Sequence, residues 1–321
     1  MSIKRIAVLT TGGDAPGMNA AIRAVVRCAV NQNIEVFGAF RGWWGLINDD
    51  MKPFGHRSVS GIINQGGTIL KTARCSEFHT ERGQAKAFTT LKRHSIDGIV
   101  VIGGNGSFTA AHRFYQKYKF PCIGIPASID NDINGINLTI GSDTAINTAL
   151  GAIDNIRDTA TSMERVFVVE VMGRDCGYIA LAVALGGGCE DVLIPERKAA
   201  FKRICGDIVK GYKSGKKSWI IVVAEGAGRA VDIAKKITQC TKLETRAVVL
   251  GHVQRGGRPT AFSRDLALKL GQAAVEQLLK GERDKAVALQ HDKFVTVDFA
   301  TAIKRKRINV DQWYKLIRIL T

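Results

Sequence analysis

Two carboxylates lie two positions apart in the segment 126–132, which reads PASIDND. Asp130 and Asp132 follow an apolar run at 122–125, so they stand where a buried strand is expected to end. One carboxylate suits a general base, and the other suits magnesium, which prefers oxygen ligands and is usually held by one or two carboxylates plus substrate phosphates. An Asx turn would also explain the pattern without any chemistry.

Two glycine-rich segments follow apolar runs as well. They are 10–19, TTGGDAPGMN, and 103–107, GGNGS. Glycine lets backbone N–H groups approach an anion, and a following helix adds a favourable dipole, so both segments predict phosphate-binding loops. A tight strand-to-helix turn explains the first equally well. The second is not a P-loop, because no Gly-Lys-Ser/Thr follows, and Thr109 breaks the dinucleotide fingerprint.

Isolated cations mark further expected loop ends. Any single one is more often a surface charge or an ion-pair partner. Several of them at loop ends in a repeating strand–helix pattern favour recognition of more than one phosphate. These residues are Arg74, Arg165, Arg174, Arg246, His252 and Arg255.

Apolar runs alternate with longer amphipathic stretches along the chain. Pro16 suits the first turn of a helix that is expected to reach about Val30. Runs that are apolar on both faces and separated by helices indicate buried parallel strands, so the predicted fold class is α/β with doubly wound sheets in two closely packed lobes. Ligands bind outside the carboxyl ends of such strands. The expected strands are 6–9, 34–40, 99–102, 122–125, 166–171, 219–223 and 247–250.

The composition is that of a globular protein with an unusual charge. The chain has 321 residues, of which 45% are hydrophobic and 23% charged, which excludes a disordered chain, a collagen and a coiled coil. Its formal net charge of +17 suggests nucleic acid, acidic lipid or phosphorylated molecules as partners, or only a solvated basic surface. The densest run, 304–307, lacks the aromatic residues of nucleic-acid readers and is expected to be an exposed helix end or tail.

Targeting and cysteine patterns favour a reducing cytoplasm. No apolar stretch reaches the roughly 20 residues of a membrane span, and no signal peptide is expected before the first strand. The seven cysteines are an odd number without Cys-x-x-Cys spacing, so neither a disulfide framework nor a zinc site is predicted.

Four motifs together resemble the bacterial ATP-dependent 6-phosphofructokinase family. They are 12–19, 129–132, 169–174 and 250–257, and they occur in order, at the family's spacing, over essentially the whole chain. The resemblance implies a glycolytic, magnesium-dependent kinase that transfers the γ-phosphoryl group of ATP to the 1-hydroxyl of fructose 6-phosphate. It also implies a cytoplasmic homotetramer under allosteric control.

The same resemblance implies two lobes and a set of site residues. The larger, ATP-binding lobe would comprise 1–141 and 255–304, and the smaller, fructose 6-phosphate-binding lobe 142–254 and 305–321. Asp130 would accept the hydroxyl proton, Arg174 would steady the transferring group, and Ser128 and the Gly13 N–H would lie beside it. The nucleotide contacts would be Gly13, Trp43, Arg74, Cys75, Gly104, Asn105, Gly106 and Ser107. The sugar-phosphate contacts would be Ser128, Asp130, Arg165, Met172, Gly173, Arg174, Glu225, Arg246, His252 and Arg255, with Arg165 and Arg246 donated by a neighbouring subunit.

An effector site for ADP or phosphoenolpyruvate is also implied. It would use Arg23, Arg27, Arg157, Glu190 and Lys216. Three positions depart from the family, which commonly has Arg, Asp and Lys there: His56, Gly61 and Ser214. These departures predict altered allosteric control.

The largest departure from the family is Asn105, where the family has an aspartate that helps hold magnesium. Asn105 and Asp132 are the expected metal ligands, and loss of one charge predicts weaker magnesium binding. A second reading is therefore a catalytically impaired or regulatory subunit, although the retained Asp130 and Arg174 argue against it. A nucleic-acid-binding protein is a third reading, resting on charge alone. Gly106 and Ala127 favour ATP over pyrophosphate as the donor.

Overall fold

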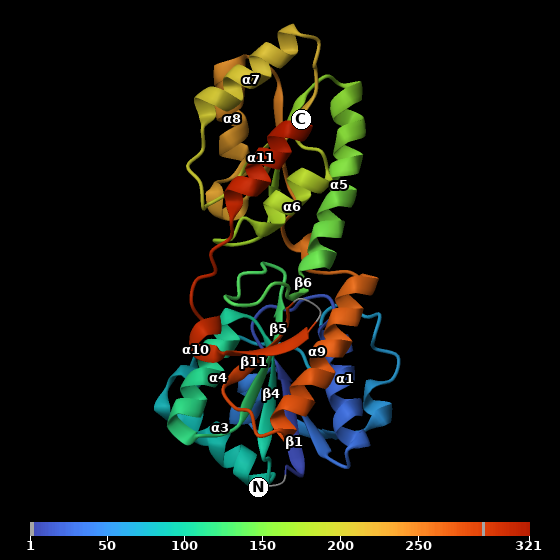
Figure 1. The fold of residues 1–321 in the computed structure, drawn as a ribbon, viewed down its shortest axis with the longest axis vertical. Helices are drawn as coiled ribbons and strands as arrows, with labels where there is room; N and C mark the ends of the chain where they lie inside the picture. Colours follow the sequence, from blue (N-terminus) through green and yellow to red (C-terminus); the bar gives the residue numbers. More distant parts are fainter. Residues whose placement is uncertain (1–2, 291–292) are drawn as a thin grey trace. The chain divides into compact units, whose positions relative to one another are not determined.

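The computed structural model describes residues 3–290 and 293–321. The chain divides into two compact units, and each unit is built from two separate segments of the chain (Figure 1). The larger unit comprises Met1–Asp143 and Gly256–Lys306, and the smaller unit comprises Thr144–Arg255 and Arg307–Thr321. The lobe boundaries expected from the sequence, after residues 141, 254 and 304, lie within two residues of the observed ones, after 143, 255 and 306.

The larger unit is built on one mainly parallel sheet, as the sequence predicts. Its strand order is β12-β11-β5-β4-β1-β2-β3, with β6 paired to β5. Only the pairs β2–β3 and β11–β12, at the two edges, are antiparallel among the described strands. The strands are β1 (Arg5–Thr10), β2 (Glu35–Ala39), β3 (Met51–Phe54), β4 (Gly98–Gly103), β5 (Cys122–Ser128), β6 (Ile140–Gly141), β11 (Lys285–Gln290) and β12 (Lys293–Asp298).

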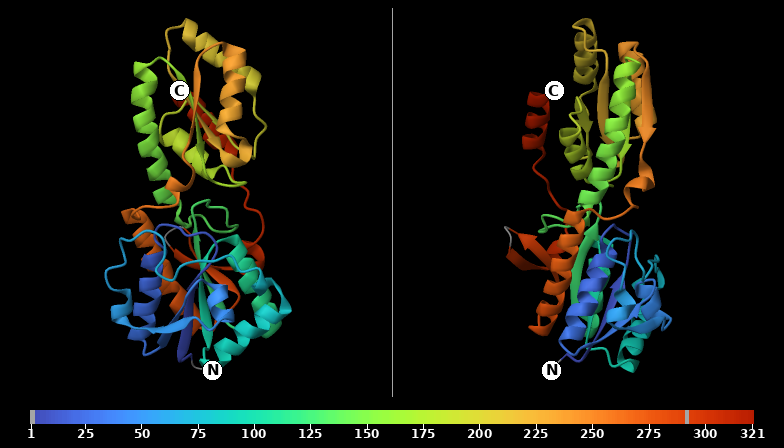
Figure 2. Two further views of the ribbon diagram at one scale, coloured as in Figure 1. Left: turned by 180° about the vertical axis from the view of Figure 1, so that it is seen from behind. Right: turned by 90° about the vertical axis from the view of Figure 1, so that its right-hand side faces the viewer.

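Helices cover both faces of this sheet. On one face, α1 (Met18–Asn31) and α9 (Ala261–Leu279) lie side by side (Figure 2). Thr260 begins α9 by accepting a hydrogen bond from the Ser263 N–H, a typical N-cap. The other face carries α2 (Trp43–Ile47), α3 (Glu81–Arg93), α4 (Asn105–Tyr118) and α10 (Phe299–Ala302) over a phenylalanine-rich core, with the short 3-10 helix η2 (Glu77–His79). A second 3-10 helix, η1 (His56–Val59), contacts α1 instead.

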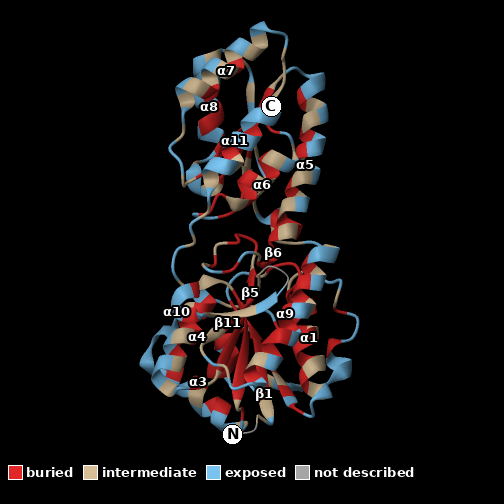
Figure 3. Cartoon of the chain, viewed as in Figure 1, coloured by how far each residue is buried: buried red, intermediate tan, exposed pale blue. Residues whose placement is uncertain are grey.

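The smaller unit has a four-stranded, fully parallel sheet of order β10-β7-β9-β8. Helices α7 and α8 pack on one face over an aliphatic core, and α6 and α11 lie on the other (Figure 3). The strands are β7 (Val166–Val171), β8 (Asp191–Leu193), β9 (Trp219–Ala224) and β10 (Thr245–Val249). The helices are α5 (Ser142–Ser162), α6 (Tyr178–Gly186), α7 (Phe201–Lys213), α8 (Ala230–Thr241) and α11 (Val310–Leu320), with 3-10 helices η3 (Glu225–Ala227) and η4 (Gly251–Gln254).

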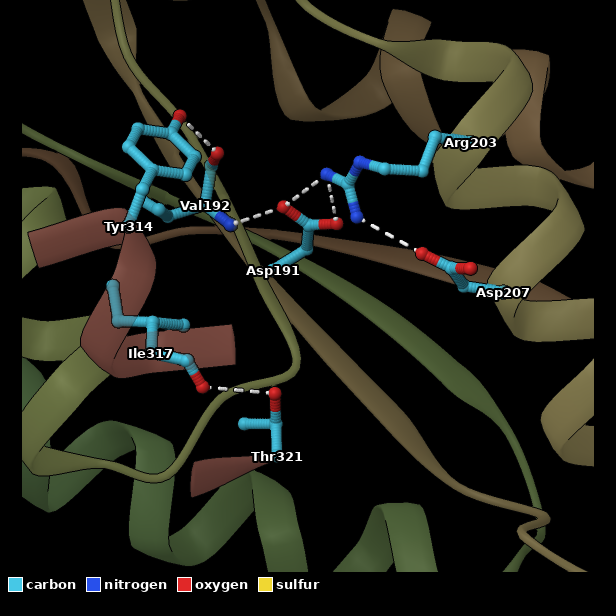
Figure 4. A network of polar contacts seen from close by, with 7 residues as sticks. All are labelled: Asp191, Val192, Arg203, Asp207, Tyr314, Ile317 and Thr321. Carbon is cyan, nitrogen blue, oxygen red and sulfur yellow. Dashed lines mark hydrogen bonds and ion pairs between the residues drawn. The ribbon is translucent and has the colours of Figure 1, made fainter. Parts of the chain in front are cut away.

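A polar network fixes the C-terminal helix α11 in the smaller unit (Figure 4). The Tyr314 hydroxyl donates to the Val192 carbonyl at 2.7 Å, and burial raises the pKa of Tyr314 to about 12, so the donor proton is retained. Beside it, Arg203 donates to both oxygens of the buried Asp191 at 2.7 and 3.1 Å and to Asp207 at 2.9 Å. Both the helix and the strand β8 are therefore held by buried polar contacts.

The sheet topology marks the position at which a ligand crevice is expected in each unit. In the larger unit, adjacent strands β1 and β4 lead to α1 and α4, which lie on opposite faces. In the smaller unit, adjacent strands β7 and β9 lead to α6 and α8, again on opposite faces. Where loops diverge in this way, a crevice opens outside the carboxyl ends of the strands. None of the helices within the described ranges is long and apolar enough to span a membrane.

One expectation from the sequence is wrong, and another is only partly right, because Lys304, Arg305 and Arg307 are exposed after the end of α10. Cys205 on α7 and Cys240 on α8 form a disulfide, although their spacing gave no indication of one. The two helices pack together, which brings residues 35 positions apart to a Cα separation of 6.1 Å. The basic run 304–307 is not a free tail: Arg305 forms a β-bridge with Ile133, and the Lys306 ammonium binds backbone carbonyls of the same loop.

The disulfide predicts the number of reactive thiols. Because Cys205 and Cys240 are joined, five thiols should react in the unfolded, unreduced protein and seven after reduction. Reduction should also lower the free energy of unfolding by up to about 3–4 kcal/mol, because the cross-link restricts the unfolded chain. Thiol titration in denaturant and calorimetry check both statements. Seven reactive thiols without reductant would contradict the bond.

Candidate active site

Three strand-end loops meet at the crevice of the larger unit. The Ser107 hydroxyl, in the first turn of α4, donates to the Thr11 carbonyl after β1 at 2.9 Å. A Cβ on Gly103 would lie 2.5 Å from that carbonyl oxygen and closer still to Ser107 Oγ, so only glycine fits at the end of β4. The Asn105 side-chain amide then donates to the carbonyl and the carboxylate of Asp132, each at 3.1 Å. These contacts join the loops after β1, β4 and β5.

The carboxylates predicted from the sequence converge in the loop after β5. Ser128, the last residue of β5, accepts a hydrogen bond from the Asp130 N–H at 3.3 Å and donates to Asp132 Oδ1 at 3.4 Å. Thr139 in turn donates to the Ser128 carbonyl at 2.5 Å. Asp130 is only 2% exposed. Ser128 therefore orients the segment that carries both carboxylates.

One oxygen in this cluster is suited to a hard cation. Asn105 Oδ1 is buried and has no hydrogen-bond partner among the described residues, while its Nδ2 is directed at Asp132. The described chain contains no group of three or more His, Cys, Asp or Glu side chains able to hold a metal by themselves. A cation at Asn105 and Asp132 would therefore take its remaining ligands from phosphates and water, as magnesium usually does.

The glycines of the two phosphate-binding loops leave space for a ligand. Gly12 and Gly13 are exposed in the turn after β1, and Gly12 adopts a φ of +85°. Gly104 is the N-cap of α4, and a Cβ on Gly106 would meet no atom within 4 Å. The backbone N–H groups at the start of a helix attract anions, so this open end of α4 is suited to a phosphate.

The other residues expected to contact the nucleotide differ in their exposure to solvent. Arg74 is exposed and forms no hydrogen bond or ion pair with the described residues. Cys75, next to it, packs against the core of the larger unit. The expected aromatic face of Trp43 is covered, because the ring is 4% exposed and stacks on Phe78 at a centroid distance of 4.2 Å. Trp43 therefore supports the core rather than presenting a free ring.

A glutamate braces the turn that carries Arg174 in the smaller unit. Glu225 Oε1, after β9, accepts from the N–H groups of Gly173 at 3.2 Å and Arg174 at 2.8 Å. Gln254 accepts from the Met172 N–H at 2.8 Å. Arg174 has a φ of +52°, an uncommon conformation for a side chain with a Cβ. The sequence pointed to Glu225 as a ligand contact, whereas Gln254 was missed, although it lies within the 250–257 motif.

Two further arginines lie at the opposite end of the small sheet. Arg165 precedes β7 and Arg246 is the second residue of β10, whereas Arg174 follows β7. Glu244 binds Arg165 at 2.8 Å and also pairs with Arg246. The six-residue strand β7 separates the two ends by roughly 20 Å. Arg165 and Arg246 therefore cannot share one small ligand with Arg174 of the same chain.

His252 and Arg255 belong to the other end of the small sheet. His252 lies in η4, which follows β10, and Arg255 is the C-cap of that helix. Both therefore come after the carboxyl end of β10, which is adjacent and parallel to β7. The structure brings them to the same end of the sheet as Arg174 and Glu225.

The residues expected to bind an effector are divided between the two units. Arg157 donates to the carbonyls of Gly187 and Gly188, and the nearly buried Glu190 pairs with Lys216 at 3.1 Å, all in the smaller unit. In the larger unit, Arg23 and Arg27 lie on α1, where Arg23 donates to the Val59 carbonyl at 2.7 Å between His56 and Gly61. Ser214 is the C-cap of α7, two residues before Lys216.

Comparison with known proteins gives a consistent result. The phosphofructokinase family model matches residues 5–278. The ATP-dependent 6-phosphofructokinases of Thermotoga neapolitana and Bacillus pumilus are 49% and 50% identical over 319 residues, covering 99% of this chain and the whole of each relative. The solved structure of phosphofructokinase from Saccharomyces cerevisiae superposes with a TM-score of 0.89 at 33% identity, covering 94% of this chain and 45% of the yeast chain.

The turn before Arg174 predicts a cost for any side chain at Gly173. Its φ is +146°, and a Cβ would lie 2.5 Å from the Cys176 carbonyl oxygen. Gly173→Ala should lower the free energy of unfolding by about 1–3 kcal/mol. Gly206→Ala is the matched control, because Gly206 lies inside α7 with open space around a Cβ, so the change should stabilise by about 0.5–1 kcal/mol. Urea unfolding of both variants checks this, and equal stabilities would contradict the geometry.

Proposed function

Because the chain belongs to the phosphofructokinase family, we propose that it is an ATP-dependent 6-phosphofructokinase. It transfers the γ-phosphoryl group of ATP to the 1-hydroxyl of fructose 6-phosphate, giving fructose 1,6-bisphosphate and ADP in glycolysis. Relatives that are named ATP-dependent 6-phosphofructokinase align with this chain over their whole length, with 49–50% identity. The observation that carries the proposal is the joining of three strand-end loops around Asp130 at the crevice of the large sheet.

The arrangement supplies what phosphoryl transfer requires. This reaction depends on alignment and on charge neutralisation more than on covalent chemistry. We assign Asp130 as the base that accepts the proton of the 1-hydroxyl, and Ser128 as the side chain that holds it in place. The Gly13 N–H, with Gly104 and Ser107 at the start of α4, would bind the phosphates of ATP. Arg174 would neutralise charge on the transferring group.

The other substrate contacts follow from the same assignment. Met172, Gly173, Glu225, His252 and Arg255 would bind the sugar phosphate within the chain that carries Arg174. Arg165 and Arg246 would serve the site of a neighbouring subunit, which is supported by their place at the opposite end of the sheet. The active unit would then be an oligomer, and we propose a homotetramer. ADP or phosphoenolpyruvate would act at the effector residues.

ATP is favoured over pyrophosphate as the phosphoryl donor. The space around Gly106 is open, so the start of α4 does not block the part of ATP beyond the phosphates. Ala127, in β5, is a buried small side chain and adds no cation at this point. Arg74, which is exposed, would contact the nucleotide phosphates.

Magnesium is the proposed cofactor, and the residues present fit it. Asn105 Oδ1 is buried without a partner in the described chain, and the Asp132 carboxylate lies against the same amide. Bound there, the cation would neutralise charge on the phosphates of ATP. Asn105 contributes no negative charge, so weak binding is expected. The alternative, a catalytically impaired or regulatory subunit, rests on this residue.

The proposed location is the cytoplasm. The proposed glycolytic substrates favour the cytoplasm. The absence of Cys-x-x-Cys spacing in the sequence agrees with a reducing compartment. The Cys205–Cys240 disulfide argues against this location, because disulfides are rare in a reducing compartment. Seven of the 46 cations are assigned to phosphate-handling positions, so the basic character needs no nucleic-acid partner.

The base assignment predicts the effect of Asp130→Ser. Loss of the proton acceptor should lower kcat by about 10²–10⁴-fold, with little change in the KM for ATP. A coupled assay of ADP formation from ATP and fructose 6-phosphate at saturating magnesium measures both constants. Asp265→Ser is the control, because Asp265 forms an exposed ion pair with Lys269 on α9 and should leave the rate unchanged. Unchanged activity of Asp130→Ser would refute the assignment.

The metal assignment predicts a gain from Asn105→Asp. A carboxylate in place of the amide should lower the magnesium concentration for half-maximal activity by roughly tenfold. Magnesium titrations of the assay check this, with Asn48→Asp as a control that adds the same charge at an exposed position after α2. An unshifted titration would contradict a metal role for residue 105. Activity that appears only in Asn105→Asp would instead favour the impaired-subunit alternative.

A further inference from the structure

The Lys306 ammonium binds the backbone of the loop that follows Asp130. Its Nζ donates to the carbonyl oxygens of Asn131 at 3.0 Å, Ile136 at 2.7 Å and Asn137 at 3.4 Å. An ammonium has three donors, so it can serve three carbonyl oxygens at once. Hydrogen bonds from a charged donor are stronger than neutral ones, so these contacts hold the two ends of the loop together.

Other contacts also shape this loop. Asn131 is fully buried with a φ of +50°, and its side-chain amide donates to the Asn137 carbonyl at 2.9 Å. Gln290 of β11 donates to the Gly135 carbonyl at 2.7 Å, and the Asn105 amide donates to Asp132. Further contacts come from the same C-terminal segment as Lys306. Asn134 donates to the Thr301 carbonyl at 3.1 Å and to the Ala302 carbonyl at 3.2 Å, and Ile133 forms a β-bridge with Arg305 (described above).

We propose that Lys306 is a positioning residue for Asp130. Asn131 is the next residue after Asp130, and Lys306 fixes the Asn131 carbonyl from the far side of the loop. Holding that peptide restrains the backbone from which the Asp130 carboxylate projects, so Lys306 acts through Asn131 rather than on substrate. This inference rests on the proposed function, because it requires Asp130 to be the base.

The position of Lys306 in the chain gives the contact a second consequence. Lys306 is the last residue of the larger unit, and Arg307 begins the crossing into the smaller one. Tyr314 anchors the far end of that crossing in the smaller unit through the Val192 carbonyl (Figure 4). The contact therefore fixes the point at which the C-terminal segment leaves the unit that carries Asp130.

The test compares substitutions within the basic run. Lys306→Met removes all three donors but keeps a side chain of similar length, and Lys306→Arg keeps the charge and the donors. Lys304→Met and Arg307→Met are the matched controls, because both side chains are exposed and form no hydrogen bond or ion pair with the described residues. The full-length enzyme is assayed at saturating ATP, fructose 6-phosphate and magnesium.

The expected result is a selective loss of kcat. Lys306→Met should lower kcat about tenfold to a hundredfold, because misplacing a catalytic group by about 1 Å costs up to that much. The KM for ATP and the thermal unfolding midpoint should stay close to those of Lys304→Met, and Lys306→Arg should recover part of the rate. In the Asp130→Ser background, Lys306→Met should have little further effect, since residues that act as a unit are not additive.

Hydrogen exchange at the amides of 131–137 gives a readout independent of activity. Exchange there should be faster in Lys306→Met than in Lys304→Met, with the rest of the larger unit unchanged. Faster exchange with unchanged kcat would make the contact merely structural and overturn the proposal, as would an equal loss of rate in the Asp130→Ser background. An inactive wild-type enzyme would instead contradict the proposed function, on which the positioning role depends.

Discussion

The close approach of two backbone segments at Gly103 is the constraint on which the site depends. The end of β4 passes so near the Thr11 carbonyl and Ser107 that no side chain fits between them. This contact lies between β1 and β4, where the loops diverge to opposite faces of the sheet. It sets the start of α4, and hence Asn105, which in turn reaches Asp132 in the third loop. Backbone packing therefore sets the frame within which Asn105 and Ser128 bind the Asp132 carboxylate.

Much of the fold could be predicted because its central strands are buried on both faces. The runs at 6–9, 99–102 and 122–125 are apolar throughout, and the run at 166–171 is apolar except for Glu170; they fall within β1, β4, β5 and β7. Three edge strands were missed: β3 and β12 have no buried residue, and β8, although buried, has only three residues. The pattern of apolar residues reveals which strands are buried. A strand that is held mainly by backbone hydrogen bonds to its neighbour has no such pattern and is hard to predict from the sequence.

The site was predictable only where its parts are adjacent in the sequence. Asp130 and Asp132 share one loop, and the glycine-rich loops are continuous segments. Contacts that join distant segments were not predictable, as with Glu244 between Arg165 and Arg246, or Lys306, which lies 175 positions from Asn131. The basic run 304–307 was expected to be an exposed helix end or tail because it lacks the aromatic residues of nucleic-acid readers. Lys306 in this run binds backbone carbonyls, which every residue has and no pattern reveals.

Asn105 shows how one substitution changes both the stability and the chemistry of this cluster. Its amide donates to Asp132, so the two side chains attract each other without any cation. A carboxylate at position 105 would face Asp132 as a like charge, and that repulsion would be relieved only by a bound metal. The asparagine thus keeps the joined loops stable without a cation, and the buried Oδ1 remains as the oxygen directed away from Asp132. A cation at the proposed site would have to compete with this hydrogen bond for the Asp132 carboxylate, so local stability and metal affinity would oppose each other at this residue.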